Sequence, residues 1–137
     1  MDLQPTTWFI VAALADFIAG IGHGVLGQRG VVSLLATARL FPSPWGDEDM
    51  SRRLLSFIWH FITAIFALSG VALLLLAAGV LEGHALPLFL SALHSAFLVI
   101  AVAYLGPRLL QALRLPVPLL ACICLMVVCV ASLAGTR

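Results

Sequence analysis

Four long apolar segments constrain this chain more than any other feature of its sequence. They cover about residues 7–28, 54–81, 85–105 and 116–134, and each is long enough to cross the hydrocarbon core of a membrane, which takes about 20 helical residues. Of the 137 residues, 63% are hydrophobic and 9% are charged, whereas soluble domains carry about 25% charged residues. The sequence therefore predicts an all-α integral membrane protein, a bundle of four transmembrane helices that forms one domain over residues 1–137.

The connection between the first two segments is expected to contain a short interfacial helix. Over about residues 31–41, the stretch "VVSLLATARLF" places its larger apolar residues at helical spacing and its polar residues elsewhere, as in helices that lie along a membrane surface. The stretch "PSPWGDEDMSRR" that follows is charged and rich in helix breakers. Within it, Ser51 is predicted to cap the second membrane helix.

The arginines predict the orientation of the chain. Two connections carry nearly all of them, the first with Arg29, Arg39, Arg52 and Arg53 and the third with Arg108 and Arg114, whereas Arg137 lies on the opposite side. The positive-inside rule places both connections in the cytoplasm and both termini outside. The first apolar run has no basic residue before it, so we expect no cleavable signal peptide. A bacterial plasma (inner) membrane is the simplest location. The net charge of +1 gives no basic surface for nucleic acid.

Small and polar residues form stripes along the first three segments. The stripes are Ala13, Asp16, Gly20, His23, Gly24 and Gly27 in the first segment, Ser56, His60, Thr63, Ala64, Ala67 and Gly70 in the second, and Ser91, His94 and Ser95 in the third. In a bilayer, small residues allow helices to approach closely, and polar residues bond across the contact. We therefore predict that the three stripes face one another, with Gly20, Gly24 and Gly27 as packing residues.

The depth of the polar residues places them in two layers. At about 1.5 Å per residue, His23 and His60 share a level roughly 8–10 Å inside the membrane, and Asp16 and His94 share a deeper one. An ionisable group at the membrane centre costs about 2.5–3.5 kcal/mol on insertion scales, so Asp16 should not face lipid. The sequence predicts a polar intramembrane pair between Asp16 and His94.

Three interpretations of these layers remain open. The first is structural: the histidines tie helices together in a non-enzymatic membrane component, an accessory subunit of a larger complex or a homo-oligomer. The second is a redox protein that binds a b-type haem through His23 and His60, beside glycines that leave room for a porphyrin. The third is an oligomeric transporter or proton path through Asp16 and His94. Catalysis is disfavoured, because the sequence lacks a Ser–His–Asp order, an HExxH motif and a phosphate loop.

The fourth segment adds a possible soft-metal site. Cys122, Met126 and Cys129 follow one another at positions i, i+4 and i+7, and their sulfur atoms would suit copper(I) or zinc. In an apolar helix, however, cysteines more often serve as small hydrophobic residues. The sequence therefore does not assign a metal to these residues.

Two motifs together resemble a known family. The stretch "GHGVLGQR" at the end of the first segment and "RRLLSFIWHFITAIFALSG" entering the second are similar to the H-S-x-x-G-E-R and W-H-x-x-[ST] patterns of small four-span bacterial inner-membrane proteins of unassigned function. The matching positions are His23, Gly27, Arg29, Trp59, His60 and Thr63. Gly24 and Gln28 stand where that family has Ser and Glu. Over residues 10–75 the resemblance implies the four-span topology and marks His23 and His60 as the site.

Overall fold

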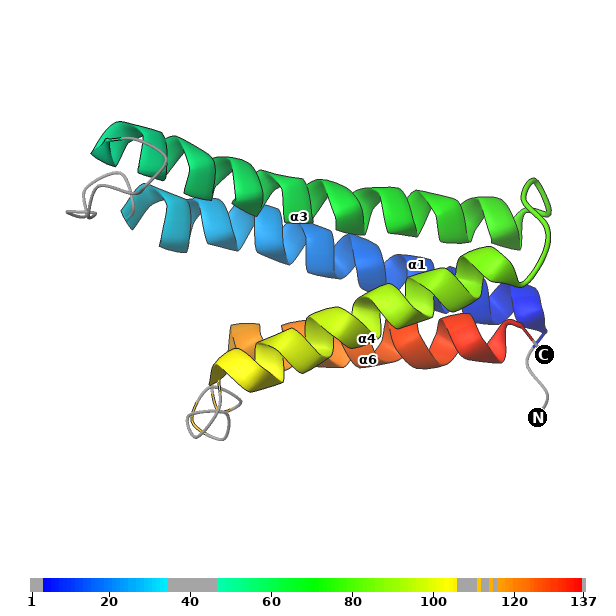
Figure 1. Ribbon diagram of the computed structural model, residues 1–137. Coiled ribbons are helices and arrows are strands. Elements are labelled where there is room, and N and C mark those ends of the chain that lie inside the picture. The colour runs from blue at the N-terminus through cyan, green and yellow to red at the C-terminus, as the bar shows by residue number, and fades with distance from the viewer. Residues whose placement is uncertain (1–3, 35–46, 106–110, 112–113, 115, 137) are drawn as a thin grey trace.

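Four long helices make up the computed structural model, which describes residues 4–34, 47–105, 111, 114 and 116–136. They are α1 (Pro5–Ile21), continued by the π-helical segments η1 (Gly22–Leu26) and η2 (Gln28–Val32), then α3 (Glu48–Ala77), α4 (Ala85–Leu105) and α6 (Pro116–Ala134). The helices run up and down in alternation (Figure 1). α1 packs against both α3 and α6, and α4 packs against α6. The predicted all-α helical bundle is confirmed.

Three of the helices are long and apolar enough to cross a membrane. They are Pro5–Val32, Glu48–Ala77 and Ala85–Ala103, with 28, 30 and 19 residues. A shorter apolar helix, Leu119–Ala134, follows within the described part of α6. Many large apolar side chains are exposed on the outside of the bundle, among them Ile21, Phe57, Leu68 and Val99. This distribution is compatible with a multi-pass membrane protein, because lipid would cover such a surface.

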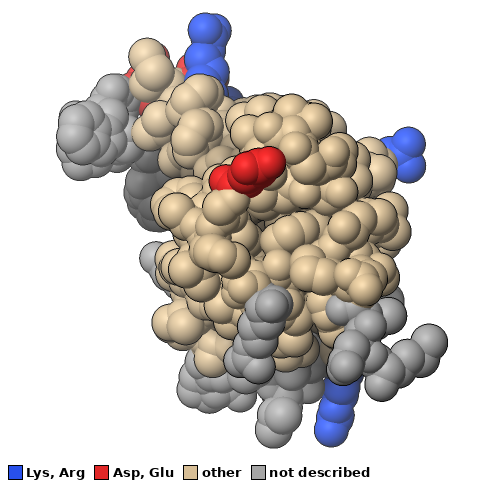
Figure 2. Space-filling model, turned by 90° about the vertical axis from the view of Figure 1, so that its right-hand side faces the viewer, with Lys and Arg blue, Asp and Glu red and all other residues tan. Residues whose placement is uncertain are grey.

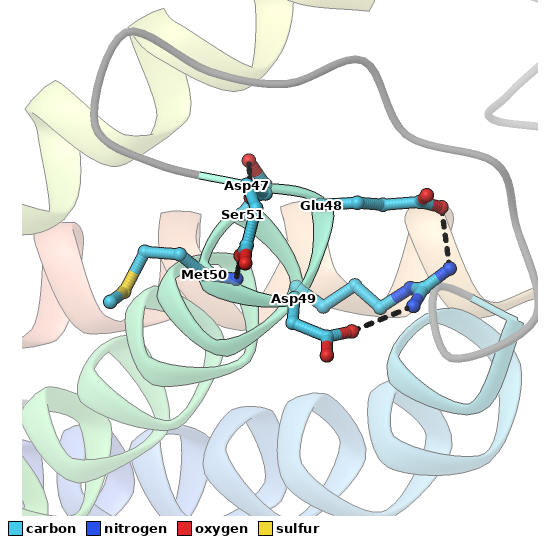
Figure 3. A network of polar contacts seen from close by, with 6 residues as sticks. Asp47, Glu48, Asp49, Met50 and Ser51 are labelled. Carbon is cyan, nitrogen blue, oxygen red and sulfur yellow. Dashed lines mark hydrogen bonds and ion pairs between the residues drawn. The ribbon is translucent and has the colours of Figure 1, made fainter.

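The start of α3 differs from its predicted position because an acidic residue caps it. The Met50 N–H donates to Asp47 Oδ1 over 2.9 Å, so the helix begins at Glu48 and not at residue 54. Ser51 lies inside the first turn, where its hydroxyl donates to the Asp47 carbonyl. The prediction that Ser51 caps this helix is therefore wrong. Figure 3 shows the network, in which Arg52 also pairs with the two acids of the first turn, at 2.5 and 3.1 Å.

The first helix does not end at the predicted residue 28. Its backbone stays helical through η1 and η2 as far as residue 34, so residues 31–34 of the predicted interfacial helix continue the membrane helix. The remaining residues of that predicted helix, 35–41, lie outside the described residues. The segment holds no proline, and its wider π-type hydrogen bonding carries the chain through four glycines without a break. Such π turns are rare and are found mostly at functional or strained positions.

A short hairpin joins α3 to α4 at the end of the bundle where both termini lie (Figure 1). α3 ends in a Schellman motif: the Val80 N–H donates to the Leu75 carbonyl, the Gly79 N–H donates to the Leu76 carbonyl, and Gly79 has a φ of +69°. Figure 2 looks at the hairpin end, where acidic atoms lie within a largely uncharged face and arginine atoms appear only at its margin. The described arginines 29, 52, 53 and 114 belong to segments at the opposite end.

Candidate functional site

Asp16 and His94 meet in the centre of the bundle. Asp16 comes from α1 and His94 from α4, and both side chains are fully buried. His94 Nε2 lies 2.7 Å from Asp16 Oδ1, and His94 Nδ1 lies 2.8 Å from the carbonyl oxygen of Leu90, one turn earlier in α4. The structure thus brings together the two residues predicted to share the deeper layer.

The hydrogen bonds of His94 fix the number of protons that the pair holds. A carbonyl oxygen can only accept, so His94 Nδ1 must carry a hydrogen that it donates to Leu90. The contact between Nε2 and Oδ1 then holds one further proton, either on the imidazolium or on the carboxylic acid. In both arrangements the pair has no net charge, which is the condition for burying it without a large desolvation cost.

The surroundings of this pair are largely apolar. The rings of Phe66 and Phe97 lie 5.9 and 6.0 Å from the His94 ring, centre to centre. Cys124 of α6 lies within electrostatic range of Asp16. Asp16 Oδ2 is buried and has no hydrogen-bond partner among the described residues.

His23 belongs to a second polar cluster, formed by η1 and α3. Its Nδ1 lies 2.9 Å from Thr63 Oγ1, and the Thr63 hydroxyl donates to the Trp59 carbonyl over 3.2 Å. Because the Thr63 hydrogen is used in that bond, His23 Nδ1 must be the donor to Thr63. The Trp59 ring stacks on the His23 ring at 4.1 Å, and its indole N–H donates to the His23 carbonyl over 2.9 Å. In neutral His23, Nε2 therefore carries the free lone pair.

His60 does not join His23 inside the bundle. It is exposed on α3, as are Ala64 and Ala67 of the predicted stripe. The face that α3 buries is turned away from them and contains Phe66, Ser69, Gly70, Leu73 and Leu76. The prediction that the small residues of α3 point inward is therefore wrong for His60, Ala64 and Ala67. The haem hypothesis for His23 and His60 stays a prediction.

His60 does not point into the bundle because aromatic residues of α3 fill the space beside the glycines of the first helix. A Cβ atom at Gly27 would lie 2.1 Å from the Trp59 ring, and one at Gly20 would lie 3.3 Å from Phe66 Cβ. At Gly24 the same atom would lie 3.1 Å from a Thr63 methyl group. Large side chains of one helix thus pack onto small residues of the other, and the room that a porphyrin would need beside Gly27 is taken by Trp59.

The sulfur-bearing residues of α6 are spread over different surroundings. Cys122 is buried, Met126 is exposed and Cys129 is half-buried. The Cys129 carbonyl accepts from the Ser91 hydroxyl over 3.1 Å, and its Sγ accepts from the Ser95 hydroxyl over 3.4 Å. Within the described ranges, no three His, Cys, Asp or Glu residues are arranged to hold a metal ion. Cys129 therefore takes part in a contact between α4 and α6.

Trp59 and Phe66 are the residues of the site that sequence reasoning missed. They lie seven residues apart, with Thr63 between them, and so share one face of α3. That spacing, together with the tryptophan in the family-like motif, is the signal that would have found them. Comparisons with protein-family models, with curated proteins and with solved structures found no match to this chain.

Proposed function

We propose that this chain is an integral membrane protein that crosses a bacterial plasma membrane four times and acts as a non-enzymatic component, an accessory or oligomeric subunit. One observation carries the proposal: buried and half-buried polar side chains bond to neighbouring helices. Asp16 bonds to His94 across α1 and α4, His23 to Thr63 across η1 and α3, and Ser91 to the Cys129 carbonyl across α4 and α6. In lipid, such contacts hold helices together where the hydrophobic effect cannot. The resemblance to small four-span membrane proteins of unassigned function supports the four-span topology of this proposal.

The membrane assignment rests on the match between helix length and bilayer thickness. The described helices have apolar outer surfaces, and their charged residues other than the buried Asp16 gather near helix ends. We expect the protein to remain with the membrane pellet after washing at high pH and to be released only by detergent. Recovery of the full-length chain in the wash would contradict the proposal.

A visible spectrum of the protein, purified in mild detergent, separates this function from the haem alternative. We expect a sample without a Soret band, because Trp59 packs against His23 and His60 faces outward. A Soret band that disappears in both His23→Ala and His60→Ala would replace the proposed function by a redox role. The band's persistence in His84→Ala, a histidine in the outer hairpin, is the matched control.

A further inference from the structure

Polar groups follow one another in depth, in a row that runs from the hairpin end through the Asp16–His94 pair to His23. At the hairpin end there is a pocket of about 260 Å³ whose lining includes Phe9, His84 and Thr136. Gly135, beside it, packs against the Phe9 ring. The pocket therefore lies at the mouth of the contact between α1 and α6.

Counted along α6, the depth of Ser132 falls between that of this pocket and that of Asp16. Ser132 is fully buried in α6, and its hydroxyl oxygen lacks a hydrogen-bond partner among the described residues, as Asp16 Oδ2 does. Ser132 is three residues inward of Gly135, about 4.5 Å, and Asp16 is seven residues inward of Phe9, about 10 Å. Because Gly135 and Phe9 are in contact, the two unpartnered oxygens are separated in depth by roughly one turn of helix. Buried polar atoms without a protein partner are the usual places for internal water.

Phe66 separates the pair from the other end of the bundle. Its ring centre lies 5.9 Å from the His94 ring and 5.9 Å from the His23 ring, and its side chain is 7% exposed. His23 itself is half-buried, and its Nε2 is free to accept a proton. The Phe66 ring is therefore next to both imidazole rings, on the side of the pair toward His23.

We propose that the protein conducts protons across the membrane along this row, with Asp16 as the proton-binding group and Phe66 as the gate. A hydronium ion from the outer pocket gives its proton to Asp16 Oδ2 and leaves a water molecule, so the neutral pair becomes positively charged. When the Phe66 ring turns aside, Asp16 Oδ2 gives its proton to a water molecule on the His23 side, and the pair is neutral again. His23 Nε2 accepts this proton and releases it to water at the arginine end of the bundle, so His23 is neutral before the next proton enters.

The other titratable groups near this route are few among the described residues. Cys124 of α6 is buried within electrostatic range of Asp16, and His84 lines the outer pocket. On the buried face of α3, Phe66, Ser69 and Leu73 do not titrate, whereas His60 is exposed but lies within electrostatic range of His23. The proposal therefore assigns the binding step to Asp16 and His94.

The test is proton flux into sealed vesicles that contain the purified full-length protein and an enclosed pH-sensitive dye, driven by a potassium diffusion potential. We expect flux above that of protein-free vesicles for the parent. Asp16→Asn should return the flux to the protein-free level. Phe66→Ala, or Phe66→Leu where the alanine variant does not fold, should raise the flux by about tenfold, as a lower barrier at the gate would. Phe61→Ala, an exposed phenylalanine of the same helix, should leave it unchanged.

The double variant Phe66→Ala/Asp16→Asn decides the route. Flux at the protein-free level, in a variant that elutes and melts like the parent, assigns the protons to Asp16. Flux equal to that of Phe66→Ala alone means that a leak elsewhere carries the protons, and it overturns the proposal. Parent and Phe66→Ala samples that both match protein-free vesicles overturn it as well.

Discussion

Asp16 is the residue that costs this fold the most to place, and its partner explains why the fold tolerates it. Asn at position 16 can donate from its amide to His94 Nε2, so the imidazole keeps both of its hydrogen bonds. We expect Asp16→Asn to unfold within a few degrees of the parent in mild detergent. Asp16→Leu leaves the buried His94 nitrogen without a partner and should lower the free energy of unfolding by about 1–3 kcal/mol. Equal stability of the leucine variant and the parent would show that the pair does not hold α1 to α4.

The sequence predicted the position of a residue well where the chemistry of its side chain allowed few positions. The juxtaposition of Asp16 and His94 followed from depth, because a charged group in lipid has few allowed positions. The orientation of His60 did not follow, since helical spacing allows more than one choice of inner face for α3. Trp59 and Phe66 look like lipid-facing residues in a single sequence. Their seven-residue spacing and the motif tryptophan are the sequence signals against that interpretation, and the opposing glycine face of the structure shows that they point inward.

At the scale of the helix, α1 depends on the absence of a side chain at Gly27. A methyl group there would lie 2.1 Å from the Trp59 ring, which cannot move freely because it stacks on His23 and donates to the His23 carbonyl. We expect Gly27→Ala to lower the free energy of unfolding by about 1–3 kcal/mol, as overpacked contacts do. Gly22→Ala is the matched control, because nothing lies within 4 Å of its Cβ position. Its stability should equal or slightly exceed that of the parent. A Gly27→Ala variant that melts like Gly22→Ala would mean that α1 and α3 are not in close contact.

The start of α3 depends on a single side chain, Asp47. Its carboxylate accepts from the Met50 N–H, and this bond satisfies one of the free donors at the helix start. We expect Asp47→Ala to cost about 0.5–2 kcal/mol and Asp47→Asn to cost much less, because asparagine also caps well. Amide hydrogen exchange provides the measurement: exchange at Met50 should accelerate in the alanine variant. Unchanged exchange there would assign the boundary to the contacts between α1 and α3 instead.

The sequence predicted the bounds of the helices better than the contacts between their side chains. The bounds 85–105 and 116–134 agree with α4 and α6, because the hairpin glycines and the proline at position 116 mark those ends in the sequence. The start of α3 was missed because a serine and three acids compete for the cap within five residues. The continuation of α1 to residue 34 was missed because glycines usually end a helix. Here Gly22, Gly24 and Gly30 lie within π turns, and Gly27 joins the two π segments.

The even number of long helices leads to the last prediction, which concerns orientation. Helices that alternate in direction bring both termini and the hairpin to one end of the bundle, as Figure 1 shows, and the described arginines belong to the other end. The positive-inside rule assigns the arginine end to the cytoplasm. Reporter fusions made after Arg53 or Arg114 should therefore read cytoplasmic, and fusions after Gly83 or at the C-terminus should read external. Paired reporters that are active on opposite sides of the membrane control for expression, and the reversed pattern would contradict the orientation. A mixed pattern, with the two ends of the chain on different sides, would instead contradict the four-span topology itself, because an odd number of crossings is then required.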